Sequence, residues 1–326
     1  MDAMKAIRFA RFGGPDVLTL DEIAATLPGS REVVIDIEAA SVTPGDWKLR
    51  EGHLQQIFPV RLPCIPGRDG AGSVAAVGDQ VDYARVGDAV CFTAERTVQG
   101  SYAEQIVRDA AGVVPLPPGL SFAEGAALMH AGTCAWIALV RFAGLQPGQK
   151  ILIHAAAGAI GGMAVQLAKH LGAAVAATCS ARNSEYVRGL GADLVLEYDR
   201  EDFARGLRDC DVVLDLVGGD VHRRSYPVLK EGGSLVWLIA QPVEDCSARY
   251  GVRFVQAHIH DDPQALAAVI DLARRSVLKP QVSRLMPLAE AAQAHRLVQG
   301  NANSRGRVIL DIRGRASHRP VQHAAA

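Results

Sequence analysis

The sequence predicts an α/β protein with two domains, one rich in β-strands and one formed by a doubly wound parallel sheet. Three observations lead to this fold class. The chain has 326 residues, and one hydrophobic core rarely keeps growing beyond ~250–300 residues. Short β-like runs between Gly/Pro turns fill the first part of the chain. From about residue 122 helical periods appear, and strands then alternate with helices.

The first part of the chain predicts a β-domain and then a long helix. β-like runs such as EVVIDIEAA and DAVCF alternate with turns such as FGGPD and TPGD, and almost no helical period appears. This pattern is typical of an antiparallel sheet that is barrel-like or partly open. Residues 123–144 contain no proline and have apolar residues at helical spacing, which predicts a helix that ends before QPGQ.

The middle of the chain predicts a parallel sheet with helices on both faces. Its expected strands are 151–154, 174–178, 193–198, 211–217, 234–240 and 251–259. The last part predicts a helix near 263–276, a strand, a further helix and a final strand at 307–312. These pieces are too few for a domain of their own, so we assign 1–124 with 263–326 to the first domain and 125–262 to the second. A frayed end is expected from Arg313 to Ala326.

Composition narrows the classes of partner. The formal net charge is -1, which gives no electrostatic reason to expect nucleic acid or an anionic membrane. The uninterrupted apolar runs fall short of the ~18 residues of a membrane span. The first twenty residues contain charges where a signal peptide needs an apolar segment. We therefore expect a cytoplasmic protein, whose six cysteines stay reduced.

The stretch HAAAGAIGG, His154 to Gly162, predicts a phosphate-binding turn between a strand and a helix. As a GxGxxG pattern it has alanine in the first place. Gly158 would let the backbone approach a pyrophosphate, free N–H groups at the helix start would stabilise its charge, and Gly161 would allow close helix–strand packing. A tight turn without a ligand is the alternative. The expected cofactor contacts are Ala156, Gly158, Ala159, Ile160 and Gly161.

The end of the next strand indicates which dinucleotide binds. About twenty residues after the turn, an Asp or Glu would accept hydrogen bonds from the ribose of NAD. The chain instead has Ser180, Arg182 and Asn183 here, so a cation and hydrogen-bond donors replace the carboxylate. This set suits a 2′-phosphate and predicts NADP(H). A solvated turn that caps the next helix is the bland alternative, and both interpretations can hold together.

Motifs along almost the whole chain match one family in order, among them MKAIRFARFGGPDVL, TPGDWKLREG, PCIPGRDGAGSVAAVG, GSYAE, VVLDLVGG and RGRVIL. On these residues the chain resembles the zinc-independent, quinone oxidoreductase-like branch of the medium-chain dehydrogenase/reductase superfamily. The resemblance implies a GroES-like catalytic domain made from both chain ends, an inserted Rossmann domain, and NADPH in the cleft. It also implies hydride transfer to quinones or α,β-unsaturated carbonyls, and a homodimer, because many relatives pair through the edge of the Rossmann sheet.

The zinc-dependent relatives supply a competing hypothesis, which the residues exclude. Those relatives hold zinc with an early cysteine, the histidine of a GHE motif and a later cysteine. Here the GHE place reads GRD at 67–69, and the early-cysteine region reads TPGD at 43–46. Because Zn²⁺ needs three or four converging Cys, His or carboxylate ligands, we expect no metal.

Two positions depart from the zinc-free relatives. Thr43 stands where these relatives usually have asparagine. Cys134 aligns with a threonine that contacts the cofactor, and Thr133 lies one place earlier. The sequence leaves open whether either residue contacts the cofactor here.

Lys48, in DWKLREG, is the expected catalytic residue. It matches a position where relatives place a lysine or tyrosine that faces the nicotinamide. Its ammonium could bind the cofactor or polarise an enone or quinone oxygen, and a solvated side chain is the alternative. Trp47, Phe58 and Tyr102 are expected to form walls of the substrate pocket.

Further cofactor contacts follow from the resemblance and from the carboxyl edge of the sheet, where a doubly wound fold binds ligands. Tyr198 aligns with a tyrosine beside the 2′-phosphate, and Arg307 replaces a lysine of the relatives. The edge contributes Val217, Gly218, Ile239, Ala240, Phe254 and Val255. Core packing is the alternative role for the apolar members of this set.

The sequence thus predicts an NADPH-dependent reductase of quinones or of the activated C=C bond of enones, working without zinc. A non-catalytic NADPH-binding sensor or structural protein is the alternative, because a fold does not fix a function. The expected partner is a small-molecule quinone or enone, with no nucleic acid and no membrane. The sequence does not indicate which quinone or enone, nor the proton donor.

Overall fold

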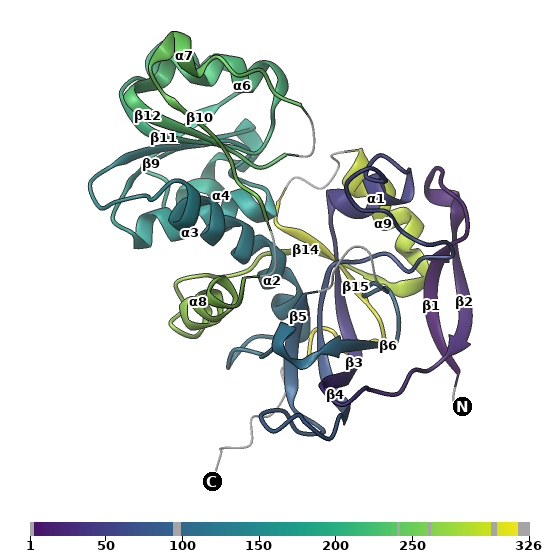
Figure 1. The fold of residues 1–326 in the computed structure, drawn as a ribbon. Coiled ribbons are helices and arrows are strands. Elements are labelled where there is room, and N and C mark those ends of the chain that lie inside the picture. The colour runs from purple at the N-terminus through teal and green to yellow at the C-terminus, as the bar shows by residue number, and fades with distance from the viewer. Residues whose placement is uncertain (1–2, 94–98, 240–241, 260–261, 301–304, 319–326) are drawn as a thin grey trace. The chain divides into compact units, whose positions relative to one another are not determined.

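The computed structural model describes residues 3–93, 99–239, 242–259, 262–300 and 305–318 (Figure 1). The chain divides into two compact units. Unit 1 comprises Met1–His130 and Pro280–Ala326, and unit 2 comprises Ala131–Lys279. Unit 1 contains a mainly antiparallel sheet and unit 2 a parallel one, which confirms the expected α/β fold class.

A seven-stranded sheet forms the main layer of unit 1, in the order β14-β15-β3-β4-β5-β7, with β6 also paired to β3. Its pairs are antiparallel except for β14 and β15, which run parallel. A separate two-stranded sheet joins β1 to β2. The strands are β1 (Ala3–Phe9), β2 (Leu18–Ala24), β3 (Glu32–Val42), β4 (Asp69–Val77), β5 (Ala89–Thr93), β6 (Gln105–Asp109), β7 (Val113–Pro115), β14 (Val282–Pro287) and β15 (Arg307–Asp311).

Two helices of unit 1 pack against each other, α1 (Pro44–Arg50) and α9 (Ala291–Gln299) (Figure 1). Short 3₁₀ turns lie at Pro15–Val17, Ala110–Gly112 and Leu288–Glu290. The sequence pattern predicts α9 but misses α1, because seven residues are too few to display a helical period. Helix α1 begins with a proline in its first turn, and the Asp46 carboxylate accepts the Thr43 N–H at 2.7 Å.

Unit 2 has a six-stranded sheet in the order β10-β9-β8-β11-β12-β13, in which every adjacent pair is parallel. Because the chain proceeds outward from β8 in one direction and then returns to β11, the strand order reverses between β8 and β11. The carboxyl ends of these two strands are where a doubly wound sheet binds ligands. The strands are β8 (Lys150–Ile153), β9 (Ala174–Cys179), β10 (Leu194–Glu197), β11 (Cys210–Asp215), β12 (Leu229–Trp237) and β13 (Arg253–Gln256).

The helices of unit 2 connect these strands. Helix α3 presents Met163, Ala164 and Leu167 to the core, as its periodicity predicts. Gly172 follows its end with φ +81°, the left-handed stop expected there. The helices are α3 (Ala159–His170), α4 (Ser184–Gly189), α5 (Phe203–Gly206), α6 (Gly219–Ser225), α7 (Ser247–Tyr250) and α8 (Pro263–Arg274), with 3₁₀ turns at Ala181–Asn183 and Tyr226–Val228.

A long helical stretch contains the boundary between the units. Helix α2 (Phe122–Trp136) continues into a π-helical segment, Ile137–Phe142. Among the described residues this is the one helix long and apolar enough to cross a membrane, and 78% of its most apolar window is buried inside the protein. Glu124 and Arg141 are charged residues within this helix, so its apolar residues do not form one uninterrupted run in the sequence.

The second unit extends further along the chain than the predicted boundary at residue 262. Helix α8 belongs to unit 2, whereas the sequence places it in the first domain. Its N-cap residue Asp262 forms an ion pair with Arg141 at 3.0 Å. After the helix, the Lys279 N–H donates to the side chain of Gln166 at 2.9 Å. These contacts with unit 2 residues explain the difference, which periodicity cannot reveal.

The expected frayed end is wrong for residues 313–318. Arg313 contacts Asp36 at 3.0 Å, and Arg315 contacts Glu38 at 3.1 Å. The carbonyl of Ala316, a wholly buried residue, accepts the Ala123 N–H at 2.8 Å. Residues 319–326 lie outside the described residues. Charge pairs between distant segments hold the described end in place.

Candidate functional site

The glycine turn follows β8 and leads directly into α3. Ala155 has φ +52°, and the Ala156 N–H donates to the Thr178 carbonyl at 3.0 Å. Gly158 is the N-cap of α3, and no side chain caps the helix. A Cβ added at Gly161 would lie 2.2 Å from the Ala155 oxygen, so only glycine fits there. The turn therefore leaves the first N–H groups of α3 without a side-chain acceptor, as an anion site requires.

His154 holds this turn to its neighbours. Its Nδ1 lies 2.9 Å from the Thr178 hydroxyl, and its Nε2 lies 2.9 Å from the Ser225 hydroxyl. The side chain is buried, and burial lowers the pKa of His154 to about 4. His154 is therefore a neutral structural residue below the turn, a role that the sequence analysis does not assign to it.

The predicted 2′-phosphate residues gather at the ends of β9 and β10. In the parallel register Glu197 pairs with Cys179, and the Tyr198 N–H donates to the Cys179 carbonyl at 3.1 Å. Tyr198 therefore follows one strand beside Ser180, which follows the other. The Asn183 amide donates to the Ser180 hydroxyl at 3.2 Å. Arg182 is exposed, and Tyr198 is 62% exposed, so both side chains are accessible.

A carboxylate does reach this turn, from a position that the sequence analysis misses. The Asp199 Oδ1 accepts the Ala181 N–H at 2.9 Å. It comes from the end of β10 rather than from the end of β9, where the pattern places the acid. That contact fixes the turn that carries Arg182. Register between neighbouring strands, which motif spacing does not contain, brings Asp199 here.

The turn after β11 is organised by Asp215. Its Oδ1 accepts the N–H groups of Val217 at 2.8 Å and Gly218 at 2.9 Å, and its Oδ2 lies 2.7 Å from the His222 Nδ1. Burial opposes ionisation of Asp215, but these hydrogen bonds outweigh it and lower the pKa of the carboxyl. Val217 is 46% exposed, and Gly218 has φ +83°. Both predicted residues therefore lie at the carboxyl edge of the sheet.

The predicted residues at the carboxyl ends of β12 and β13 differ in their surroundings. Phe254 is half-buried and packs against the core through Trp237 and His222, whose ring centroids lie 5.7 and 5.8 Å away. Val255 is half-buried on β13. The Cδ1 atom of Ile239 would lie 2.3 Å from a Cβ at Gly218, so Ile239 closes over the β11 turn. Ala240 lies outside the described residues.

Lys48 and Trp47 occupy adjacent, half-buried positions on α1. The Lys48 Nζ lies 5.7 Å from the centroid of the Trp47 ring. Burial lowers the pKa of Lys48, and no carboxylate among the described residues lies within ion-pair distance of its ammonium. The location of the Lys48 ammonium is therefore set by the position of α1. A substrate atom that gains negative charge could pair with this ammonium without competition from a carboxylate of the described residues.

The other two predicted wall residues differ. Phe58 is half-buried against a small apolar cluster made by Phe9, Leu49, Leu54, Val60 and Cys64. Tyr102 is wholly buried, and its hydroxyl lies 3.4 Å from Asp46 and 3.3 Å from His295. Tyr102 is therefore a core residue and not a pocket wall. An aromatic residue beside a Gly–Ser turn gives no signal of burial in the sequence alone.

Arg307 opens β15 and is a buried arginine with free donors. Its side chain is 5% exposed, and its Nε and Nη2 atoms have no hydrogen-bond partner among the described residues. Asp69, at the start of β4, lies near it, and burial raises the pKa of that carboxyl. The Arg307 charge and a hydrogen bond with the Ser41 side chain oppose this rise. Because buried donors without an acceptor are costly, the Nε and Nη2 atoms of Arg307 indicate a place for an anionic or polar ligand.

The described residues contain no group of three or more His, Cys, Asp or Glu side chains that could hold a metal ion. Thr43 and Arg68, at the places of two zinc ligands of the zinc-dependent relatives, are buried directly after β3 and directly before β4. Cys134 and Thr133 are both buried in α2.

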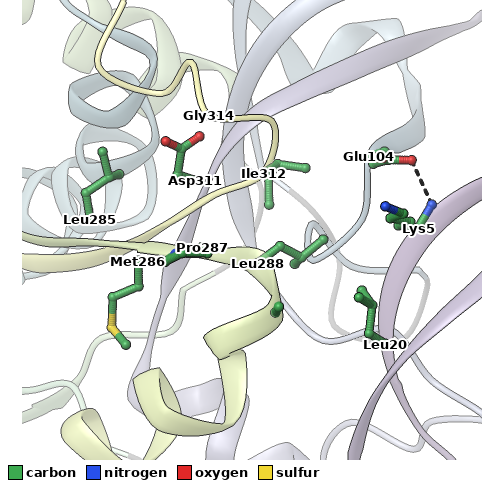
Figure 2. A pocket seen from close by; sticks show the side chains of 11 residues that line it. Lys5, Leu20, Glu104, Leu285, Met286, Pro287, Leu288, Asp311, Ile312 and Gly314 are labelled. Atoms are coloured by element: carbon green, nitrogen blue, oxygen red, sulfur yellow. Dashed lines mark hydrogen bonds between the residues drawn. The ribbon is translucent and has the colours of Figure 1, made fainter.

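A separate pocket of about 400 Å³ lies in unit 1, away from the predicted residues. Figure 2 shows Leu285, Asp311 and Ile312 around it, with the Lys5 N–H donating to Glu104 at 2.8 Å. Its wall is largely apolar, and none of the predicted site residues lines it.

The comparisons with known proteins agree with this arrangement. Residues 29–118 match the family described as alcohol dehydrogenase GroES-like domain, and residues 190–310 match the family described as zinc-binding dehydrogenase. A chloroplastic quinone-oxidoreductase homolog of Spinacia oleracea is 33% identical, over 94% of this chain and 98% of the relative. A 2-methylene-furan-3-one reductase of Solanum lycopersicum is 39% identical, over 72% of this chain and 62% of the relative.

A solved structure shows the same fold. The quinone oxidoreductase from Coxiella burnetii superposes with a TM-score of 0.86 at 32% identity, over 96% of this chain and all of that one. This likeness covers both units and confirms the resemblance inferred from the motifs. The chain is thus an oxidoreductase that belongs to the quinone oxidoreductase family of the medium-chain dehydrogenase/reductase superfamily.

Proposed function

We propose that the protein is an NADPH-dependent reductase of quinones or of the activated C=C bond of α,β-unsaturated carbonyls. The observation that carries this proposal is the uncapped start of α3 beside a turn in which only glycine fits at position 161. Relatives named for quinone and furanone reduction support the class of substrate. When bound, the reduced nicotinamide supplies the hydride.

The residues present fit a dinucleotide. The N–H groups at the start of α3 would hold the pyrophosphate, since the N-cap residue Gly158 provides no side-chain capping hydrogen bond. Within unit 1, Arg307 has two buried donor atoms without a hydrogen-bond partner among the described residues, which suits an arginine that binds an anion.

The choice of NADPH over NADH depends on the turn after β9. Arg182 and Tyr198 expose a cation and a hydroxyl on neighbouring strand ends, and both could bind a 2′-phosphate. The Asp199 carboxylate accepts the Ala181 N–H and so faces the backbone of the turn. Fixing the turn in this way supports the role of Arg182.

Lys48 would stabilise the negative charge that grows on the substrate oxygen. Its ammonium has no carboxylate partner among the described residues, and burial lowers its pKa, so its charge is only weakly satisfied within the protein. A substrate oxygen that gains charge would be a favourable partner in such a place. Trp47 and Phe58 would provide apolar surface for a quinone or enone ring.

The reaction as proposed needs no zinc. The chain has threonine, arginine and aspartate where zinc-dependent relatives have cysteine, histidine and glutamate, so the ligand chemistry differs. Metal analysis of the purified protein tests this directly. Turnover that persists after removal of metal by a chelator is expected, and loss of turnover with recovery on adding zinc would contradict it.

The protein is further proposed to be a homodimer. β13 is an edge strand of the unit 2 sheet, and one of its sides pairs with no other strand among the described residues. Such an edge is a ready surface for a second copy. Sedimentation velocity at micromolar concentration tests this, and a single species of monomer mass would contradict it.

The activity itself is tested by following NADPH absorbance with a panel of quinones, alkenals and enones. Turnover with at least one member is expected, with NADH a poorer donor. Tight binding of NADPH without turnover on any acceptor would instead support a non-catalytic sensor or structural protein.

A further inference from the structure

Buried polar side chains join both ends of helix α1 to helix α9. Asp46 and Arg50 lie one helical turn apart on α1, and His295 comes from α9. The Arg50 Nη1 lies 3.0 Å from the His295 Nδ1, the His295 Nε2 lies 3.3 Å from the Tyr102 hydroxyl, and that hydroxyl lies 3.4 Å from the Asp46 Oδ2. Asp46, Arg50, Tyr102 and His295, which we call the α1 ring, are each at most 1% exposed.

The donors and acceptors of the α1 ring allow its hydrogen bonds to run in one direction only, from Arg50 through His295 and Tyr102 to Asp46. A guanidinium has only donors, so Arg50 donates and the Nδ1 of His295 must accept. The proton of the imidazole is then on Nε2, where it is donated to the Tyr102 oxygen. The Tyr102 hydroxyl in turn donates to the Asp46 carboxylate. His295 is therefore neutral, and burial together with the nearby Arg50 lowers the pKa of His295 to about 3.

Arg50 has further contacts that fix the end of α1. It donates to the Gly13 carbonyl at 2.9 Å and to the Gln299 side chain at 3.2 Å, and it also pairs with the Glu51 carboxylate. The charge of the buried guanidinium is thus neutralised and its donors are used. These partners come from three separate segments of unit 1.

A seven-residue helix has no stability of its own in water, so tertiary contacts decide how α1 is oriented. Trp47 and Lys48 lie between Asp46 and Arg50, the two residues of α1 in the ring. The side chain of Lys48 has no ion pair among the described residues that would hold it independently. Its position is therefore set by the backbone of α1.

We infer that the α1 ring is a positioning device for Lys48 and Trp47, with Tyr102 and His295 as its positioning residues. The inference rests on the proposed function, in which Lys48 faces the substrate. Tyr102 and His295 touch no reacting group themselves. They act through Asp46 and Arg50 on the orientation of α1.

Tyr102→Phe tests the α1 ring, because it removes one oxygen and retains the ring shape. A matched control exists in unit 2. Tyr226 is also wholly buried, and its hydroxyl also lies 3.3 Å from a histidine Nε2, that of His222. It donates to the Glu244 carbonyl, where Tyr102 donates to a carboxylate. Tyr226→Phe therefore makes the same chemical change far from α1 in the sequence.

Hydrogen exchange of the peptide that covers residues 44–53 is the first measurement. Tyr102→Phe should speed exchange there roughly tenfold, the effect of losing a buried hydrogen bond. Tyr226→Phe should leave this peptide unchanged. Arg50→Lys, which keeps the charge and loses the planar fork, should act like Tyr102→Phe. Unchanged exchange in Tyr102→Phe, or equal acceleration in both tyrosine variants, would overturn the inference.

Steady-state kinetics is the second measurement. In Tyr102→Phe the kcat with a quinone should fall about tenfold, while the KM for NADPH stays the same, because a displaced Lys48 acts on the reacting end only. Faster exchange with an unchanged kcat would overturn the positioning role. If the wild-type protein reduces no acceptor, the proposed function fails, and the exchange experiment still decides whether the ring fixes α1.

Discussion

The Arg50 guanidinium lies 3.0 Å from the imidazole Nδ1 of His295, and both side chains are wholly buried. This buried arginine uses its donors within the protein. Arg307, which is also buried in unit 1, has two donor atoms without a partner among the described residues. The same substitution at the two arginines should therefore change the stability of the ligand-free protein by different amounts.

Arg50→Met should destabilise the protein by about 3 kcal/mol, since it leaves the buried Nδ1 of His295 without its donor and removes the cation that pairs with Glu51. Arg307→Met should change the stability of the ligand-free protein much less, because it removes two buried donor atoms without a hydrogen-bond partner among the described residues, which offsets the lost attraction to Asp69. The stabilisation that NADPH confers should shrink in Arg307→Met. Thermal unfolding with and without NADPH measures both effects, and equal destabilisation of the two variants would contradict the assignment.

Gly161→Ala should weaken NADPH binding and cost about 1–3 kcal/mol of stability, because the new Cβ would lie 2.2 Å from a backbone oxygen. Gly162→Ala is the matched control, since the nearest atom to its Cβ would be the end of the Leu190 side chain at 3.3 Å, with no atom closer than that. Urea unfolding and NADPH titration compare the two. A Gly162→Ala variant as impaired as Gly161→Ala would show that the tight turn is not the cause.

Arg182→Ala should weaken NADPH binding about tenfold, the value of a charge-assisted hydrogen bond at an exposed site, and should change NADH binding little. Fluorescence titration of both cofactors gives the ratio. Arg188→Ala, an exposed arginine on the following helix, serves as a control for general loss of positive charge. Equal losses for NADPH and NADH would refute the 2′-phosphate assignment.

Acid should destabilise the protein partly through His154. Its pKa is about 4 in the folded protein and 6.5 ordinarily, so the unfolded chain binds its proton first. Stability should therefore fall as pH drops from about 6.5 to about 4, by about 1.4 kcal/mol per pH unit for this group. His154→Asn should have a shallower dependence in urea unfolding. An unchanged slope would exclude His154 as a source.

Much of the fold could be predicted from the sequence, because strands and helices of unit 2 have clear periods and the glycine turn has a fixed spacing. Helix α1 could not, since seven residues show no period. The extent of unit 2 could not either, because it depends on contacts such as Arg141 with Asp262. The candidate site shows the same difference between residues that a local pattern predicts and residues that long-range contacts bring in.

Motif spacing along the sequence predicts the site residues that share one turn. The other site residues come together through strand register and long-range contacts. Gly158 and Gly161 stand in one turn, so a motif predicts them. Asp199 reaches the turn before Arg182 only because β9 and β10 are neighbours in parallel register. The contact of His295 with Arg50 joins residues 245 positions apart. Such long-range contacts leave no pattern in a single sequence.

Transfer of deuterium from NADPH to product tests the central claim most directly. The measurement uses NADPH labelled with deuterium at C4 on the transferred face, and an enone that the protein reduces. The proposed hydride transfer predicts one carbon-bound deuterium at the electrophilic carbon of the product for each NADPH consumed. Consumption of NADPH without deuterium at that carbon, or no consumption with any acceptor, would contradict it.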